Sequence, residues 1–253
     1  MTARPPHRRT RRTLVAGALC TGLAAGLAGC GGDDPDAGTN GVGRLDPAKI
    51  QNRTVKAAQA AATVHLAGTV VSGGRTYKLD MRLKDDGGTG SVTTGGSTFR
   101  LLRVGEHLYL KAGAEFWTHS SGADDAQGSS GDAAAAEKLD GKYVKVPTGD
   151  PAYKRLSTFT DKDVLLDGLL TLHGTLDKGD RSTSGSTRTI QLTGDDGAGG
   201  TLDVSLEGTA YPLRLERAGD AGTLQLTEWG RDFALTEPEE TETVDYGQAL
   251  PTN

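Results

Sequence analysis

The sequence predicts an α+β fold, in which helices pack against one antiparallel sheet. Apolar and polar residues alternate with a period of two in many short segments, which is typical of half-buried strands. Glycine-rich turns separate these segments, and connections this short join antiparallel neighbours. The 37 glycines and the 5% aromatic content also favour short strands over a helical bundle. Two helical patterns, one at the start and one in the middle of the domain, supply the second layer.

The first helix is expected to begin after Asp46. An aspartate is a preferred N-cap, and Pro47 suits the first helical position because an N–H would have no partner there. An alanine-rich run continues the pattern to about Ala62. We therefore expect one helix over residues 46–62.

A meander of strands follows this helix. Apolar side chains alternate over residues 64–70 and again over residues 77–83. Turn sequences then separate three further expected strands, at residues 90–93, 98–104 and 107–111. Beyond them we expect a Ser/Gly/Asp-rich surface loop at residues 119–132 and an alanine-rich helical turn from about residue 132. A strand is expected next, at residues 143–146.

The most apolar helix is expected in the middle of the chain, with Thr160 or Asp161 as its cap. Its leucines fall on one stripe, formed by Leu165, Leu166, Leu169 and Leu170. Strand patterns return after it, at residues 187–193, 201–207, 213–217, 224–228 and 233–235. About ten strands without an internal repeat predict a single domain over residues 46–240, followed by an acidic and polar tail at 241–253.

Residues 1–29 have the pattern of an export signal. An arginine-rich head precedes an uncharged, mostly apolar run over residues 14–29. As a helix this run would span about 24 Å, short of the roughly 30 Å hydrocarbon core of a bilayer, so it is typical of a signal peptide. Arg11 and Arg12 also fit a twin-arginine pattern, and the sequence leaves the export route open.

The end of this run, Leu27-Ala28-Gly29-Cys30, resembles the lipobox of bacterial lipoproteins. The resemblance implies that the Cys30 thiol receives a diacylglyceryl group and that cleavage occurs just before it. Cys30 would then be the mature N-terminus and a lipid anchor on the extracytoplasmic face of the cell membrane. Residues 30–45, rich in Gly and Asp, are expected to form the lipidated cysteine and a flexible tether.

The composition argues against several function classes. Removal of the five arginines in residues 1–29 moves the formal charge from −5 to −10, which does not suit nucleic-acid binding. With Cys20 removed and Cys30 acylated, no thiol remains for a disulfide, for catalysis or for a metal. The sequence also lacks paired histidine spacing and the common nucleophile and phosphate-loop motifs. We expect a monomer with no enzyme activity, no metal and no cofactor.

The order of these segments resembles the LppX/LprAFG-like lipoproteins, which share the LolA-like fold. The similarity is carried by residues 104–111, the Phe116-Trp117 pair, the helix at 163–172, the strand Tyr211-Pro212-Leu213-Arg214-Leu215, and Trp229. It implies a strongly curved antiparallel sheet, an open half-barrel, wrapped over helices. It also implies that acyl chains of lipids or glycolipids bind in an apolar cavity between sheet and helices.

The expected lining of such a cavity comes from the sheet and from the middle helix: Val70, Leu79, Met81, Leu83, Leu165, Leu166, Leu169 and Leu170. A membrane-anchored lipid binder or carrier is therefore the first hypothesis. The alternative is a surface-anchored protein-interaction or sensor module, in which the same residues form a filled core and no lipid binds.

Overall fold

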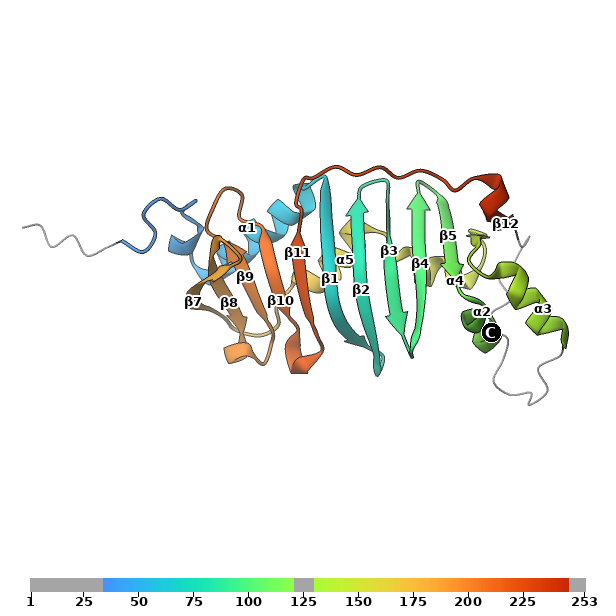
Figure 1. Ribbon diagram of the computed structural model, residues 1–253. Coiled ribbons are helices and arrows are strands. Elements are labelled where there is room, and N and C mark those ends of the chain that lie inside the picture. The colour runs from blue at the N-terminus through green and yellow to red at the C-terminus, as the bar shows by residue number, and fades with distance from the viewer. Residues whose placement is uncertain (1–33, 121–129, 246–253) are drawn as a thin grey trace, which may run out of the picture. The chain divides into compact units, whose positions relative to one another are not determined.

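The computed structural model describes residues 34–120 and 130–245 (Figure 1). The chain divides into two compact units, Met1–Pro35 and Asp36–Asn253. Only the last two residues of the first unit are described.

One open sheet of twelve strands dominates the described residues, in the order β12-β6-β5-β4-β3-β2-β1-β11-β10-β9-β8-β7. All neighbours are antiparallel except β12 and β6, which are parallel. The strands are β1 Thr63–Ser72, β2 Arg75–Lys84, β3 Gly87–Thr94, β4 Ser97–Val104, β5 His107–Ala112, β6 Tyr143–Val146, β7 Leu176–Ser184, β8 Thr187–Gly194, β9 Thr201–Ser205, β10 Pro212–Glu216, β11 Thr223–Thr227 and β12 Thr243–Asp245. The predicted α+β class with an antiparallel sheet over helices is confirmed.

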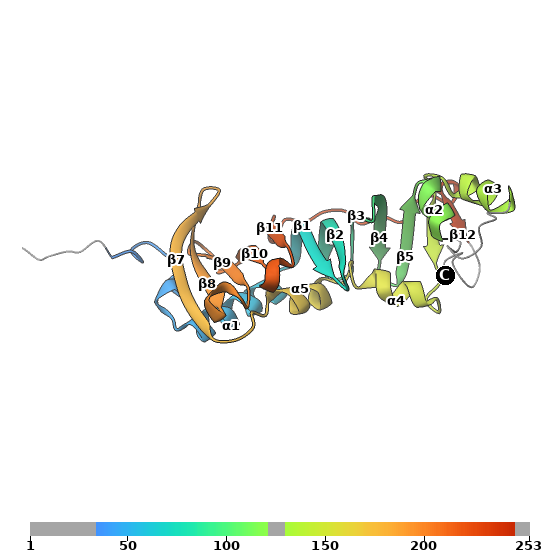
Figure 2. The same ribbon diagram turned by 90° about the horizontal axis from the view of Figure 1, so that it is seen from below.

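Five α-helices accompany the sheet in the described residues: α1 Pro47–Ala60, α2 Ala114–Ser120, α3 Ser130–Leu139, α4 Pro151–Ser157 and α5 Lys162–Leu170. Figure 2 shows α1, α5 and α4 along one face of the sheet. The opposite face carries the polar side chains of the alternating strands, as in β2, where Leu79, Met81 and Leu83 are buried and Asp80 and Arg82 are exposed. The helices therefore cover the apolar face.

The N-caps explain where two of the helices begin. The Asp161 side chain accepts a hydrogen bond from Val164 N at 3.0 Å, as expected for the cap of α5. Asp46 occupies the cap position of α1, and Pro47 follows it. Its carboxylate, however, lies 2.7 Å from Lys49 Nζ and makes no capping bond. Proline at the first position thus supports this helix start without help from the aspartate.

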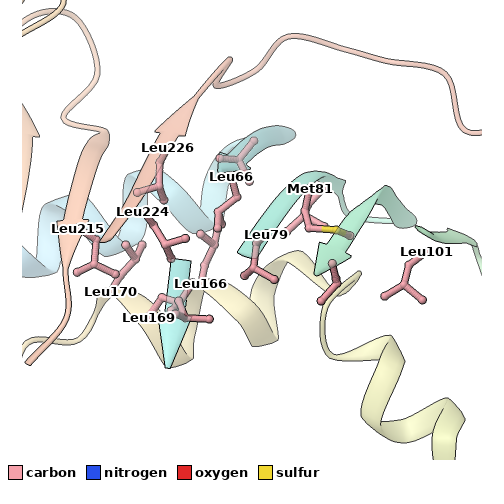
Figure 3. Close-up of a cluster of buried hydrophobic side chains, with 14 of the residues drawn as sticks. Leu66, Leu79, Met81, Leu101, Leu166, Leu169, Leu170, Leu215, Leu224 and Leu226 are labelled. Carbon is pink, nitrogen blue, oxygen red and sulfur yellow. The ribbon is translucent and has the colours of Figure 1, made fainter. Parts of the chain in front are cut away.

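The core is a continuous layer between the sheet and α5. Figure 3 shows Leu166, Leu169 and Leu170 of α5 directed toward leucines of the central strands, including Leu224 and Leu226 of β11. Leu166 and Leu170 are each 1% exposed. The predicted leucine stripe therefore does face the sheet, and Leu166 and Leu170 belong to the filled core.

Two glycines permit a close approach of main chains at the centre of the sheet. Gly68 of β1 has φ +145°, and a Cβ there would lie 2.1 Å from the carbonyl oxygen of Thr223. Gly222, which precedes β11, has φ +115°, and a Cβ there would lie 2.1 Å from the carbonyl oxygen of Thr69. Only glycine fits both positions, so the β1–β11 pairing depends on them.

The predicted tether and tail boundaries are wrong for the residues that the structure describes. Residues 36–45 pack on the sheet rather than forming a flexible tether: Asn40 Nδ2 donates to Ser205 O at 3.0 Å, and Val42 is fully buried. Residues 243–245 of the predicted tail form β12 beside β6. Specific side-chain contacts order a Gly/Asp-rich stretch that composition alone assigns to coil.

Several elements differ from the sequence prediction. Residues 233–235 are not a strand; they lie in the segment that runs along the strand ends from β11 toward β12 (Figure 1). The structure adds β7, β12, α2 and α4, which the sequence analysis missed. The loop predicted at 119–132 is helical at both ends, because α2 includes residues 119–120 and α3 includes residues 130–132. Its residues 121–129 lie outside the described residues.

Candidate ligand pocket

An apolar pocket of about 260 Å³ opens where the ends of β1 and β2 meet α5. Its lining is uncharged except for one arginine, and consists of Val70, Ser72, Tyr77, Leu79, Thr158, Phe159, Val164, Leu165, Gly168, Leu169 and Arg217. The pocket lies on the helix-covered side of the sheet, where strand alternation places the apolar side chains. It suits a hydrocarbon group, because an apolar wall makes no demand for polar partners.

Two aromatic rings form one wall of this pocket. The rings of Tyr77, on β2, and Phe159, between α4 and α5, have centroids 5.9 Å apart and are tilted by 43°. The first turn of α5 supplies Val164, whose side chain is apolar and yet 54% exposed. An exposed valine beside an apolar hollow marks the side from which a ligand can enter.

Arg217 is the charged residue of the lining. It follows β10, and its main-chain N–H donates to Gly222 O at 2.9 Å, so the extended conformation continues past Glu216. Side chains alternate along such a segment, which places Arg217 on the same side as the buried Leu215. Arg217 therefore contributes to the pocket lining, whereas Glu216 and Arg214 lie on the other face and pair with each other.

The residues predicted to line a cavity fall into two groups. Val70, Leu79, Leu165 and Leu169 do line the apolar pocket. Met81, Leu83, Leu166 and Leu170 are at most 1% exposed and belong to the packed core beside it. Cys30, the predicted lipidation site, lies outside the described residues.

Sequence reasoning missed seven of the eleven lining residues, among them Tyr77, Phe159, Val164 and Arg217. Tyr77 precedes Leu79 by two residues and therefore lies on the same side of β2 as the buried leucines. The alternation of this strand could thus have identified Tyr77 as a lining residue. Arg217 likewise continues the alternation of β10 beyond Leu215. Phe159 lies in the connection between α4 and α5, and no periodicity in the sequence points to it.

A larger hollow of about 570 Å³ lies near the β5–β6 edge, but its lining is polar and includes Glu106, His107, Lys145 and Asp245. Beside it, His107 Nδ1 lies 2.6 Å from Glu237 Oε1.

The same carboxylate of Glu237 accepts a hydrogen bond from the Tyr109 hydroxyl at 2.9 Å. These two hydrogen bonds, from His107 first and then Tyr109, lower the pKa of Glu237. Burial, and then the hydrogen bond to Glu237, raises the pKa of Tyr109 to about 12. This polar cluster attaches residue 237 to β5 and offers no surface for a hydrocarbon chain.

Residues 34–120 and 130–245 contain no group of three or more His, Cys, Asp or Glu residues that could hold a metal ion. Across the helices described, none is long and apolar enough to cross a membrane.

The open, mostly antiparallel sheet over helices is the fold of the LppX/LprF-like proteins, a LolA-type fold. LprF from Mycobacterium bovis superposes with a TM-score of 0.51 at 16% sequence identity, over 77% of this chain and 99% of LprF. The lipoprotein LppX from Mycobacterium tuberculosis gives a TM-score of 0.44 at 17% identity, over 76% of this chain and all of LppX. No family model and no curated protein matches the sequence. The resemblance inferred from the order of sequence segments is thus confirmed at the level of the fold.

Proposed function

We propose that this protein is a membrane-anchored extracytoplasmic lipoprotein that binds one alkyl chain in the apolar pocket between β1, β2 and α5. The pocket itself supports this proposal most directly: ten of its eleven lining residues are uncharged, and Val164 leaves it accessible from outside. The resemblance to lipoproteins that bind acyl chains supports it as well. No catalytic arrangement enters the proposal.

The size of the pocket limits the ligand. Its volume of about 260 Å³ is below the range of roughly 300–1,000 Å³ typical of sites that enclose a whole drug-sized ligand. It therefore suits part of a single chain, with the remainder outside, rather than several acyl chains of one lipid. Each buried methylene contributes about 0.8 kcal/mol, so a short contact length still gives measurable affinity.

Substitution of Leu169 tests this site. Leu169 lines the pocket, so the indole of Leu169→Trp is expected to fill space otherwise available to the ligand, with little loss of stability. The mature chain from residue 30, carrying Cys30→Ser so that its own acyl groups are absent, is titrated calorimetrically with 1-dodecanol. We expect binding by the parent chain and at least about ten-fold weaker binding by Leu169→Trp.

Two further variants separate the pocket from the core. Asp167→Trp places the same ring on the exposed side of α5 and should leave binding intact. Leu170→Trp overfills a position that is 1% exposed and should cost about 1–3 kcal/mol of stability. If the parent chain binds no dodecanol, the pocket proposal is wrong. Leu169→Trp melting as low as Leu170→Trp would show that Leu169 is packed core rather than pocket lining.

A second candidate function is a protein-interaction or sensor module without a lipid ligand. The packing of Leu166 and Leu170 against the sheet favours it, because half of the predicted cavity wall is filled core. The dodecanol titration separates the two candidates, since only the first predicts saturable binding that Leu169→Trp removes.

Membrane anchoring through Cys30 has its own test. Two acyl chains on one cysteine hold a protein stably at a bilayer, whereas one chain gives only marginal binding. In cells of a lipoprotein-processing bacterium, Cys30→Ala is expected to leave the precursor uncleaved or to release the chain from the membrane fraction. A cleaved and still membrane-bound Cys30→Ala chain would contradict the anchor.

A further inference from the structure

We propose that Arg217 makes this site selective for amphiphiles with an anionic head group, such as a carboxylate or a phosphate monoester. The inference rests on the proposed function and specifies its ligand class. Arg217 is the charged residue among eleven in the pocket lining. It shares the lining with Gly168 and Leu169 near the end of α5, and an alkyl chain inside the pocket would carry its head there.

The guanidinium of Arg217 has no ion-pair or hydrogen-bond partner among the described residues. The nearby Arg214, by contrast, is engaged, because it pairs with Glu216. Glu216 also accepts from Thr201 Oγ1 at 3.4 Å. An arginine that is half-buried beside an apolar wall and unpaired thus offers five N–H donors to a ligand.

The apolar surroundings strengthen this donor. A charge at the edge of an apolar hollow is less screened than one on an open surface, so its attraction to an anion is larger. Arginine also binds carboxylates and phosphates through two parallel hydrogen bonds, which fixes the head relative to the chain. A ligand with a hydrocarbon tail at Leu79 and Leu169 and an anionic head at Arg217 matches both the apolar part and the charged part of the lining.

The chemistry at Arg217 is shared by fatty acids and by lipids with a phosphate head, and the experiment distinguishes them. Dodecanoate, dodecyl phosphate and 1-dodecanol have the same chain and differ only in the head. Each is titrated below its aggregation concentration at about pH 8, where the carboxylate is ionised. The chains compared are the Cys30→Ser mature chain and its Arg217→Gln and Arg214→Gln variants.

We expect at least one anionic ligand to bind the parent chain about ten-fold or more tightly than dodecanol, because charged hydrogen bonds add to the chain contribution. Arg217→Gln should remove this difference while the dodecanol affinity stays the same. Arg214→Gln, on the opposite face, should keep it. Which of carboxylate and phosphate binds more tightly identifies the source of the head group.

Two results would overturn the selectivity. One is equal affinity of dodecanol and both anions for the parent chain, and the other is an anion preference that persists in Arg217→Gln. The first needs no variant, so it stands even if Arg217→Gln folds poorly. If dodecanol itself fails to bind, the pocket proposal fails instead, and the two failures are therefore distinguishable.

Discussion

Lys162 Nζ lies 2.9 Å from Asp85 Oδ1, although Lys162 is 2% exposed and the Asp85 side chain is 76% exposed. The same ammonium donates to the carbonyl oxygens of Gln59 at 2.9 Å and Ala61 at 2.7 Å. One buried cation thus connects the start of α5, the end of α1 and the β2–β3 turn. Its charge also complements the negative end of the α1 dipole. Because α5 forms a wall of the apolar pocket, this connection helps to position the pocket.

Lys162→Met should destabilise the domain by about 1–3 kcal/mol, because the two carbonyl oxygens lose their donor. The measurement is chemical denaturation followed by circular dichroism. Lys49→Met is the matched control: Lys49 is exposed and pairs with the exposed Asp46, so little change is expected. Equal losses in the two variants would show that the buried connection has no special role.

Gly68→Ala should also be strongly destabilising, by more than about 1 kcal/mol. Its Cβ would lie 2.1 Å from Thr223 O, in a sheet centre that cannot shift without breaking the β1–β11 pairing. Gly149→Ala provides the comparison, since a Cβ there meets nothing within 4 Å. Thermal melting of both variants checks the prediction, and a Gly68→Ala chain as stable as Gly149→Ala would contradict it.

Periodicity predicted the central sheet because one face of each strand is buried. β2 has a clear alternation, with Leu79, Met81 and Leu83 buried, and its boundaries were close to those observed. β7 was missed because most of its residues are exposed, so its sequence has no apolar period. β12 has three residues, too few for a pattern, and depends on its partner β6. Strands of this kind are set by tertiary contacts rather than by local sequence.

The candidate site was predicted only in part, for a related reason. The leucine stripe of α5 indicated which side chains face the sheet, but not whether the space between them is filled. Leu169 reaches the pocket, whereas Leu166, one turn earlier, is buried in the core. Packing on this scale depends on side-chain volumes across strands far apart in sequence, and Arg217 comes to α5 only through the fold.

The N-terminal segment gives a third prediction. Asn40 Nδ2 donates to Ser205 O at 3.0 Å and Gly208 O at 3.1 Å, and Asn40 Oδ1 accepts from Val42 N at 3.1 Å. Asn40→Ala should therefore cost about 1–3 kcal/mol.

Asn52→Ala makes the same chemical change on the exposed side of α1 and should stay within about 0.5 kcal/mol of the parent. Limited proteolysis adds a second measurement, because loosening of residues 36–45 lets the chain around the exposed Arg44 enter the active site of trypsin. Asn40→Ala that is neither less stable nor cleaved faster than Asn52→Ala would show that this segment is not held by its asparagine.

The contact between Tyr109 and Glu237 gives a pH-dependent prediction. Burial and the hydrogen bond to Glu237 raise the pKa of Tyr109 to about 12, from an ordinary value of 10.0. A raised pKa means that the fold prefers the neutral phenol. The contribution of Tyr109 to stability is therefore fully present below about pH 10 and is lost as the pH rises through about 12.

Ultraviolet difference spectroscopy of tyrosine ionisation checks this prediction. Tyr109→Phe should remove one tyrosine that titrates near pH 12, whereas Tyr143→Phe, whose ring packs edge-on against Tyr109, should leave that transition in place. Glu237→Gln should move it only part of the way toward 10, because burial is the larger cause. If Tyr109→Phe leaves the high-pH transition unchanged, Tyr109 is not the tyrosine with the raised pKa, and the prediction is wrong.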